Sequence, residues 1–265
     1  MILQDIYIYP IKSLGGIQLN TAKLEERGLQ HDRRWMLVDG SGMFLSQRTH
    51  PQMALLQVQL KKDALLVTHK NNPDLHIEIP IKPETEQLTP VTIWEDTVEG
   101  QVVSEAVNEW FSEFMAMPCT LVKMPESTQR KLKAKYAVNG ESVSYADGMP
   151  YLIIGQESLN DLNARLEKPV PMDRFRPNLV FSGGTAFIED EWKKVKIGEA
   201  TFKITKPCAR CVMTTVDQAT AQKNKEPLKT LASYRTVDNN VMFGQNMLVL
   251  TGDSIKIGDL VVGEK

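Results

Sequence analysis

Short segments in which apolar and polar residues alternate recur along most of this chain, and they restrict it to a mainly β fold. In the first hundred residues they are ILQDIYIYPI, RRWMLVD, LLQVQL, ALLVTH, LHIEIPI and VTIWEDTVEG. Turn-forming residues separate them, as in DGSG at 39–42 and NNPD at 71–74. Alternation sends successive side chains to opposite faces of a strand. Short strands at this spacing predict a sandwich or a barrel.

Two segments predict helices instead. In EAVNEWFSEFM, Ala106, Trp110, Phe111 and Phe114 recur at helical spacing, so we expect this face in the core. In QESLNDLNARLEK, Ser158 is the expected N-cap, and three leucines follow on one face. Strands are predicted again in YLIIG, NLVFSGG, KKVKIGEATFKITK, VMTTVD, NMLVLTG and IKIGDLVVG. The predicted fold class is therefore mostly β with a few helices (α+β).

The stretch MPESTQRKLKAKYAVNGESVS, residues 124–144, is polar and basic and offers few anchors for a core. We predict a linker or mobile loop here, with its charges on a solvated surface. It separates two predicted domains, residues 1–123 and residues 124–265.

The charge balance and the cysteine count narrow the class of protein. The chain has 31 basic and 33 acidic residues and a net charge of −2, so no general attraction to nucleic acid polymers or to an anionic membrane is expected. The N-terminus does not resemble a signal peptide, and no apolar run is long enough to cross a membrane. With three cysteines, a disulfide framework is not expected, and the predicted location is the cytoplasm.

The segment ITKPCARCVMTTVD contains the most informative residues of the chain, because Cys208 and Cys211 lie three apart in it. A structural zinc site needs four ligands, and no second C-x-x-C pair is present. A redox dithiol is expected at the start of a helix, whereas the residues that follow are β-branched. Two packed thiols, or a thiolate that binds something else, are the further alternatives. The residues alone leave these alternatives open.

Cations near the pair favour the last alternative. Lys206 and Arg210 flank the cysteines, and a neighbouring positive charge favours a thiolate. A thiolate is a soft ligand that suits a transition metal. One cysteine is enough if a bound organic cofactor supplies the other ligands. Donors for an anionic cofactor occur at predicted strand ends: Lys12, Ser13, Arg33, Arg174, Arg176 and Asn178.

The ordered motifs YPIKSLGG, RGLQHDRRWMLVD, YADGMPYLIIGQESLNDLNARL, RFRPNLVFSGG and PCARCVMTTVD cover nearly the whole chain. The second half resembles a MOSC domain, the module shared by the C-termini of molybdenum cofactor sulfurases and related reductases. The first half resembles the β-barrel domain that precedes it. Among these reductases, the chain resembles the mitochondrial amidoxime reducing component and bacterial reductases of the YcbX type, which act on N-hydroxylated bases.

The resemblance implies a molybdenum site in which Cys211 is the metal ligand and Cys208 is not. It also implies a group of residues that hold the pterin cofactor: Lys12, Ser13, Arg33, Asp147, Arg176, Asn178, Ala209 and Arg210. Asp147 or a nearby group is further expected to handle protons, which makes Asp147 a candidate catalytic residue beside Cys211. Relatives carry hydroxyl residues after this aspartate, whereas this chain has Gly148 and Met149.

The function implied by the resemblance is a molybdenum-cofactor (molybdopterin) oxidoreductase. It would reduce hydroxylamines, hydroxylated bases or amidoximes to the parent amines. No iron–sulfur cluster is expected, because three cysteines cannot supply four thiolates. Electrons would then come from a separate ferredoxin, flavin or cytochrome protein. Pyridoxal phosphate is not supported. The alternative is a cofactor carrier or sulfur-transfer module with a persulfide on Cys208 or Cys211.

Overall fold

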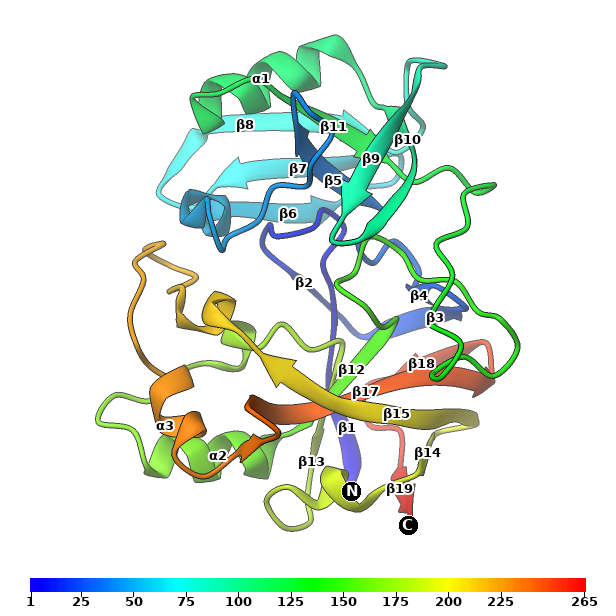
Figure 1. Ribbon diagram of the computed structural model, residues 1–265, viewed down its shortest axis with the longest axis vertical. Helices are drawn as coiled ribbons and strands as arrows, with labels where there is room; N and C mark the ends of the chain where they lie inside the picture. The colour runs from blue at the N-terminus through cyan, green and yellow to red at the C-terminus, as the bar shows by residue number, and fades with distance from the viewer.

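A computed structural model describes residues 1–265 (Figure 1), and it consists mostly of strands with three α-helices. The predicted mostly-β class with a few helices is therefore confirmed. The α-helices are α1 (Glu105–Met115), α2 (Gln156–Ala164) and α3 (Leu228–Ala232), and the 3-10 helices are η1 (Pro51–Leu55), η2 (Met172–Arg174), η3 (Ile188–Glu191) and η4 (Val212–Thr215). None of the helices has the length and apolar character needed to span a membrane.

The largest sheet has nine strands in the order β19-β14-β15-β17-β12-β13-β1-β2, with β16 paired to β17. Its strands are β1 (Ile2–Ile8), β2 (Ile17–Leu19), β12 (Tyr151–Gly155), β13 (Leu179–Ser182), β14 (Lys194–Ile197), β15 (Ala200–Arg210), β16 (Thr236–Val237), β17 (Asn240–Thr251) and β19 (Val261–Glu264). All neighbours are antiparallel except β12 and β13. The N-terminal strand β1 thus completes a sheet built from the second half of the chain. The domain boundary between residues 123 and 124 stays a prediction.

The remaining strands form three smaller sheets, in the orders β5-β11-β10-β9, β6-β7-β8 and β18-β3-β4. Their bounds are β3 (Thr21–Glu25), β4 (Gly28–Leu29), β5 (Trp35–Asp39), β6 (Leu56–Leu60), β7 (Ala64–His69), β8 (Asn72–Pro80), β9 (Leu88–Ile93), β10 (Asp96–Val102), β11 (Cys119–Lys123) and β18 (Ser254–Lys256). Figure 1 shows the first two sheets with α1 in one half of the molecule and the nine-stranded sheet in the other.

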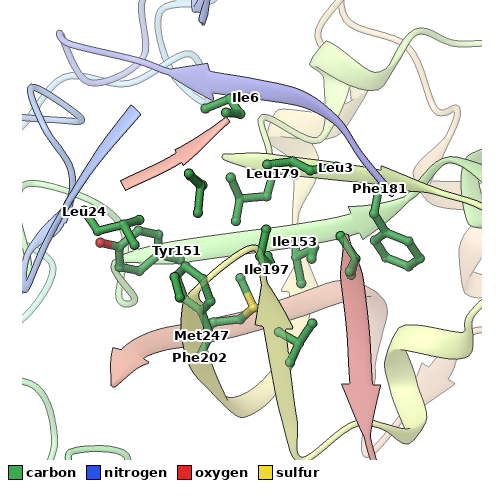
Figure 2. Close-up of a cluster of buried hydrophobic side chains, with 14 of the residues drawn as sticks. Leu3, Ile6, Leu24, Tyr151, Ile153, Leu179, Phe181, Ile197, Phe202 and Met247 are labelled. Carbon is green, nitrogen blue, oxygen red and sulfur yellow. The ribbon is translucent and has the colours of Figure 1, made fainter. Parts of the chain in front are cut away.

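The largest apolar cluster fixes the nine-stranded sheet (Figure 2). It contains 18 buried residues, which come from β1, β3, β4, β12 to β15, β17 to β19 and from Trp192 before β14. Within it the rings of Tyr151 and Phe202 meet edge to face with 5.4 Å between centroids. Phe181 and Trp192 pack with 4.9 Å between centroids. This core holds β12, β13 and β15 rigidly. Residues that precede β12 and β13, together with the C-terminal end of β15, line the cavity described below.

Helix α1 packs against the first-half sheets with a face slightly different from the predicted one. Its buried residues are Val107, Phe111 and Met115. Trp110 and Phe114 are only partly buried, and Ala106 is exposed. The prediction for Ala106 was wrong because the buried stripe runs one residue later along the helix than the aromatic pattern indicated.

The N-cap of α1 gives a simple test of this assignment. Ser104 accepts a hydrogen bond from the backbone N–H of Val107 at 3.3 Å. Replacing Ser104 by alanine should lower the free energy of unfolding by about 1 kcal/mol, because one buried helical N–H loses its acceptor. Urea denaturation measures this difference. A Ser104→Thr control keeps the acceptor and should stay close to the wild type; equal losses in both variants would contradict the capping role.

Several local predictions were wrong for identifiable reasons. VTIWEDTVEG is not one strand but a hairpin of β9 and β10, because Trp94 turns the chain with a φ of 57°. VMTTVD begins as the 3-10 helix η4, in which Thr214 Oγ1 donates to the carbonyl of Cys211 at 3.0 Å. Such side-chain bonds to nearby carbonyls compete with strand pairing. Strand β8 already begins at Asn72, within the predicted turn 71–74.

The predicted cap of α2 was also wrong. Gly155 holds the N-cap position, and Ser158 lies inside the first turn. The hydroxyl of Ser158 donates to the buried carboxylate of Glu189, at 2.8 Å from Oε1, and accepts from the backbone N–H of Phe187 at 2.8 Å. The three leucines of the predicted helix are buried: Leu159 and Leu162 on α2, and Leu166 just after its end.

The segment 124–144 contains no named helix or strand, but it is anchored and not a free linker. Leu132 and Val143 are buried in an apolar cluster with Leu248. The backbone N–H of Leu132 donates to Glu141 O, and that of Val143 donates to Arg130 O, both at 2.9 Å. Arg130 is only 4% exposed, so the predicted solvated surface is wrong for this cation.

Candidate functional site

One large cavity, of about 850 Å³, collects the residues that the sequence predicted to act together. Eleven of its 34 lining residues are Lys or Arg and three are Asp or Glu, although the whole chain is slightly acidic. The lining includes every predicted site residue: Lys12, Ser13, Arg33, Asp147, Arg176, Asn178, Ala209, Arg210 and Cys211. These residues come from five separate parts of the sequence. An excess of buried and half-buried cations of this kind favours an anionic ligand.

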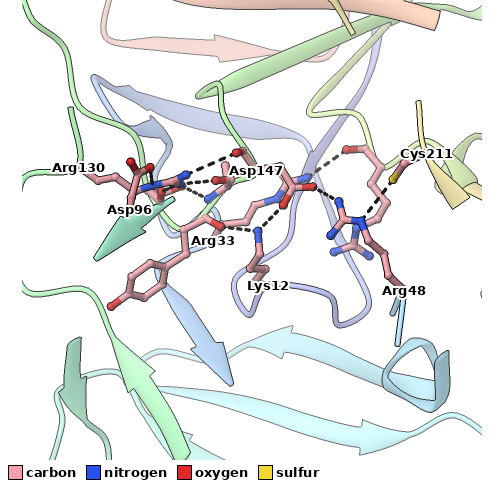
Figure 3. A network of polar contacts seen from close by, with 11 residues as sticks. Lys12, Arg33, Arg48, Asp96, Arg130, Asp147 and Cys211 are labelled. Atoms are coloured by element: carbon pink, nitrogen blue, oxygen red, sulfur yellow. Dashed lines mark hydrogen bonds and ion pairs between the residues drawn. The ribbon is translucent and has the colours of Figure 1, made fainter. Parts of the chain in front are cut away.

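A chain of polar contacts connects the cysteine to the aspartate (Figure 3). Lys12 Nζ lies 2.5 Å from Asp147 Oδ1 and donates to the carbonyl of Tyr145 at 2.7 Å. Arg48 Nη2 donates to Asp147 Oδ2 at 2.7 Å, and Arg48 Nε lies 3.4 Å from Cys211 Sγ. Arg48 therefore bridges the carboxylate and the thiol.

The electrostatics of this group follow from burial and pairing. Burial of the Lys12 ammonium lowers its pKa to about 8, although Asp147 counteracts the shift. Partial desolvation would raise the pKa of Asp147, but the charges of Lys12 and Arg48 outweigh it and hold the pKa well below the usual range. For Arg48, burial lowers the pKa, and the nearby Asp147 and Cys211 raise it by more. At neutral pH the carboxylate is therefore ionised and both cations are charged.

The lowered pKa of Lys12 predicts a measurable pH dependence of stability. Between about pH 8 and pH 10.5 the unfolded chain binds a proton at Lys12 that the folded chain has released, so the free energy of unfolding rises with pH. Relative to a Lys12→Met variant, the wild type should gain about 2 kcal/mol between pH 7 and pH 10. Urea denaturation of both proteins at the two pH values tests this. A constant difference between them would contradict the buried, charged state of Lys12.

Tyr9, which belongs to the same region as the Lys12–Asp147–Arg48 contacts, lies between two guanidinium groups. The Cζ atoms of Arg33 and Arg176 are 4.2 Å and 4.1 Å from the centroid of its ring. Arg33 Nη1 binds both carboxylate oxygens of Asp32, at 2.8 Å and 2.6 Å. Arg176 Nη1 donates to the carbonyl of Leu14 at 2.8 Å, and burial lowers the pKa of Arg176 to about 10. The two cations are thus fixed in place before any ligand arrives.

Backbone conformation marks the same region. Ser13, Arg33 and Arg176 have φ values of 69°, 49° and 51°. Non-glycine residues rarely adopt this left-handed conformation, which carries strain and clusters at functional sites. Three of the predicted cofactor residues share it.

Other predicted residues are placed in the lining but are already engaged. Asn178 donates to Tyr7 O at 3.2 Å and accepts from Leu152 N at 3.2 Å, so both ends of its amide hold strands together. Arg210 donates to the carbonyls of Phe243 and Phe175, at 2.9 Å and 3.0 Å, and not to the cysteines. The cation beside Cys211 is Arg48, which corrects the expectation drawn from the flanking residues.

Sequence reasoning missed two important cations. Arg48 follows an unremarkable turn sequence and lies 163 positions from Cys211, so no local pattern connects them. Arg130 was assigned to a solvated charge run, but its Nε lies 2.7 Å from Asp96 Oδ2 and its Nη1 donates to Ser144 O at 3.0 Å. Only the scarcity of apolar anchors around Arg130 could have suggested that the loop packs through its polar groups.

Comparison with known proteins assigns the chain to a family. The profile of the MOSC N-terminal beta barrel domain matches residues 1–118, and that of the MOSC domain matches residues 140–262. The chain is 33% identical over 275 residues to mitochondrial amidoxime-reducing component 1 of Mus musculus, covering 97% of this chain and 80% of that protein. The chain belongs to the MOSC family.

Two further relatives show the range of this MOSC group. Mitochondrial amidoxime reducing component 2 of Rattus norvegicus is 34% identical over 281 residues, covering 98% of this chain and 82% of the relative. A molybdenum cofactor sulfurase of Oryza sativa subsp. japonica is 34% identical over 262 residues, covering 91% of this chain but 32% of the relative. The MOSC chain thus spans about a third of the sulfurase.

The donors of the MOSC cavity fit a molybdopterin ligand. Four buried polar atoms of its lining residues have no hydrogen-bond partner within the protein: Ser13 Oγ, Arg48 Nη1, Arg174 Nε and Arg210 Nη2. Buried donors without partners are costly, and a bound phosphate or pterin oxygen would satisfy them. The volume is also in the range of cofactor sites, about 300–1,000 Å³.

The metal-binding capacity of the protein alone is small. No three His, Cys, Asp or Glu residues are grouped so that they could hold a metal ion. Cys208, Cys211 and the buried Cys119 are all free thiols. A metal beside Cys211 would therefore depend on ligands that the cofactor carries, as a dithiolene provides. Gly148 and Met149 line the cavity where relatives were expected to carry hydroxyl groups, so that edge offers no side-chain donor.

Proposed function

We propose that this chain binds the molybdenum cofactor with Cys211 as the metal ligand and reduces N-hydroxylated compounds. Its substrates would be hydroxylamines, hydroxylated bases or amidoximes, and its electrons would come from a separate ferredoxin, flavin or cytochrome protein. One observation carries the proposal: a single cation-rich cavity combines a half-buried thiol with donors that lack partners. The amidoxime-reducing names of two relatives that match nearly the full chain support the reaction type.

Each side chain has a defined task in this proposal. Ser13 Oγ and Arg210 Nη2 would bind polar atoms of the cofactor, and Arg176 would add a fixed positive charge for its phosphate. When bound, the cofactor supplies the two-electron chemistry at its metal. The protein supplies a thiolate at Cys211 and a cavity whose walls are held by backbone hydrogen bonds.

Proton handling is assigned to the Lys12–Asp147 pair. The strongly lowered pKa of Asp147 keeps it ionised, so it acts as an acceptor that orients Lys12 Nζ and Arg48. With its pKa lowered to about 8, Lys12 can release and regain a proton near neutral pH. We therefore assign the proton-donating role to Lys12 Nζ and the positioning role to Asp147.

The direct test is reduction of benzamidoxime and of a hydroxylamine by protein produced together with molybdopterin biosynthesis, with reduced methyl viologen as the electron donor. The expected result is formation of benzamidine and of the amine in proportion to the molybdenum content. Protein produced in cells that lack molybdopterin synthesis is the matched control. Absence of turnover by molybdenum-loaded protein would contradict the proposal.

A second candidate function is cofactor carriage or sulfur transfer. It is favoured by the presence of both Cys208 and Cys211 in the lining of the same cavity and by the similarity to a molybdenum cofactor sulfurase. Mass spectrometry of the intact chain after incubation with a cysteine desulfurase and cysteine distinguishes the two functions. A stable additional sulfur on either cysteine, together with no reductase activity, would favour this candidate.

A further inference from the structure

The cavity lining carries a second group of cations in addition to those around Cys211, and because three of them are exposed we call this part of the lining the mouth. Lys131, Lys133 and Lys135 lie on the segment after Arg130, and Lys206 lies on β15; all four line the cavity. Lys206 precedes Cys211 by five residues, which corresponds to at most about 16 Å along a strand. The two cationic groups can therefore contact opposite ends of one elongated ligand.

The lysines converge on one aromatic ring. The Nζ atoms of Lys206 and Lys135 lie 4.4 Å and 4.9 Å from the centroid of the Tyr136 ring. Partial burial would raise the pKa of Tyr136, but these two ammonium groups outweigh it and lower that pKa. Two like charges thus meet over one phenol, an arrangement that a bound anion would stabilise.

Three of these four cations have no carboxylate partner. Lys131, Lys135 and Lys206 form no ion pair, and only Lys133 pairs, with Glu95 at 3.3 Å. Glu141, an acid of the same segment, uses its carboxylate to accept from the backbone N–H groups of Val138 and Asn139, at 2.8 Å and 3.0 Å. The positive charge at the mouth is therefore free to act on a ligand.

The segment 124–144, which carries three of these lysines, is held in position by packing and by an ion pair. Leu132 is buried, and Tyr136 packs against the same apolar cluster. Arg130 Nε lies 2.7 Å from Asp96 Oδ2, which ties the segment to the β9–β10 hairpin (Figure 3). At the tip of that hairpin Trp94, 47% exposed, lies 4.6 Å from the guanidinium of Arg48. The hairpin therefore connects the lysine group with the residue that contacts Cys211.

We propose that Lys135, Lys206 and Tyr136 form a second anion subsite, which binds a phosphate at the far end of a ligand that extends to Cys211. The inference rests on the proposed function, and it specifies the substrate: an N-hydroxylated base that carries a phosphate, as in a nucleotide, is preferred over a compact neutral amidoxime. The same chemistry would also hold the outer phosphate of a nucleotide-extended form of the cofactor. The measurements below distinguish a phosphate on the substrate from a phosphate on the cofactor.

The first measurement compares N-hydroxycytidine with its monophosphate as substrates of the molybdenum-loaded chain. The wild type should show a KM about tenfold lower for the monophosphate, because two charge-assisted contacts are added. Lys135→Ala/Lys206→Ala should remove this difference, with the nucleoside KM and kcat unchanged within about twofold. The control Lys61→Ala/Lys62→Ala removes the same charge from exposed residues outside the cavity and should keep the preference.

The second measurement does not depend on turnover. Calorimetric titration of the cofactor-free chain with cytidine monophosphate should show binding that the Lys135→Ala/Lys206→Ala variant loses and the control keeps. If the phosphate belongs to the cofactor, the two substrates have the same KM. Mass spectrometry of the cofactor released from the wild type then finds a nucleotide extension, and the Lys135→Ala/Lys206→Ala variant holds less of this extended cofactor. No preference, no lysine-dependent binding and no extended cofactor would overturn the subsite. Lysine-dependent nucleotide binding by a loaded chain without turnover would overturn the proposed function alone.

Discussion

A Cys211→Ser variant should lose reductase activity by about a thousandfold or more, while its fold is preserved. A serine hydroxyl stays protonated at neutral pH and is a hard, weak donor, so it cannot replace a thiolate at a soft metal. The side chain is half-buried at the end of β15, and oxygen is smaller than sulfur, so no clash is introduced. Turnover of benzamidoxime per bound molybdenum, and not per protein, is the quantity to compare.

The matched control is Cys208→Ser, three residues earlier in the same cavity lining. Cys208 packs at the edge of the apolar cluster that contains Phe175 and Phe243, and the hydrogen bond of Arg48 to a cysteine goes to Cys211. Its replacement should leave turnover within about threefold of the wild type. If both variants lost activity equally, or if Cys211→Ser kept more than a tenth of it, the assignment of the metal ligand would be wrong.

Replacing Arg48 by alanine should lower kcat about a hundredfold. The substitution removes the contact with Cys211 Sγ at 3.4 Å and the ion pair with Asp147 at 2.7 Å. Bonds that involve a charged group each contribute about 1.5–3 kcal/mol. Losing two of them leaves Cys211 without its cation and leaves Asp147 paired with Lys12 alone. Because Arg48 acts through Cys211 and Asp147, the electronic absorption of the bound cofactor should shift as well.

Two further variants make the Arg48 test specific. Arg48→Lys keeps the charge but cannot reach both partners with one planar fork, so an intermediate loss is expected. Arg165→Ala breaks an exposed ion pair with Asp161 on α2 and should not change kcat. A normal absorption spectrum together with unchanged kcat in Arg48→Ala would exclude a positioning role for this residue.

The sequence predicted the strands well, because their alternating patterns are local. It failed where side chains override the pattern: Trp94 reverses the chain in the middle of an apolar stretch, and Thr214 bonds back to Cys211 O. Burial of Arg130 was equally hidden, because its acceptors are backbone carbonyls and one distant carboxylate. Such contacts leave no periodic signal in the residues themselves.

The site could be predicted only through the resemblance, because its residues come from distant segments. Lys12 and Asp147 are 135 positions apart, and their ion pair exists only after β1 has joined the sheet of the second half. The cysteine pair by itself left several chemistries open. Arg48 was missed because its significance lies in two partners that the fold brings to it, Asp147 and Cys211.

The molybdenum content of the purified chain tests the central claim most directly. The chain would be produced with active molybdopterin biosynthesis in molybdate medium and analysed by inductively coupled plasma mass spectrometry, beside a Lys12→Met/Arg176→Met variant of the same cavity. We predict close to one molybdenum per wild-type chain, with a matching amount of released pterin, and much less in the variant. A folded wild-type chain without molybdenum, from cells in which a reference molybdoenzyme is fully loaded, would contradict the account.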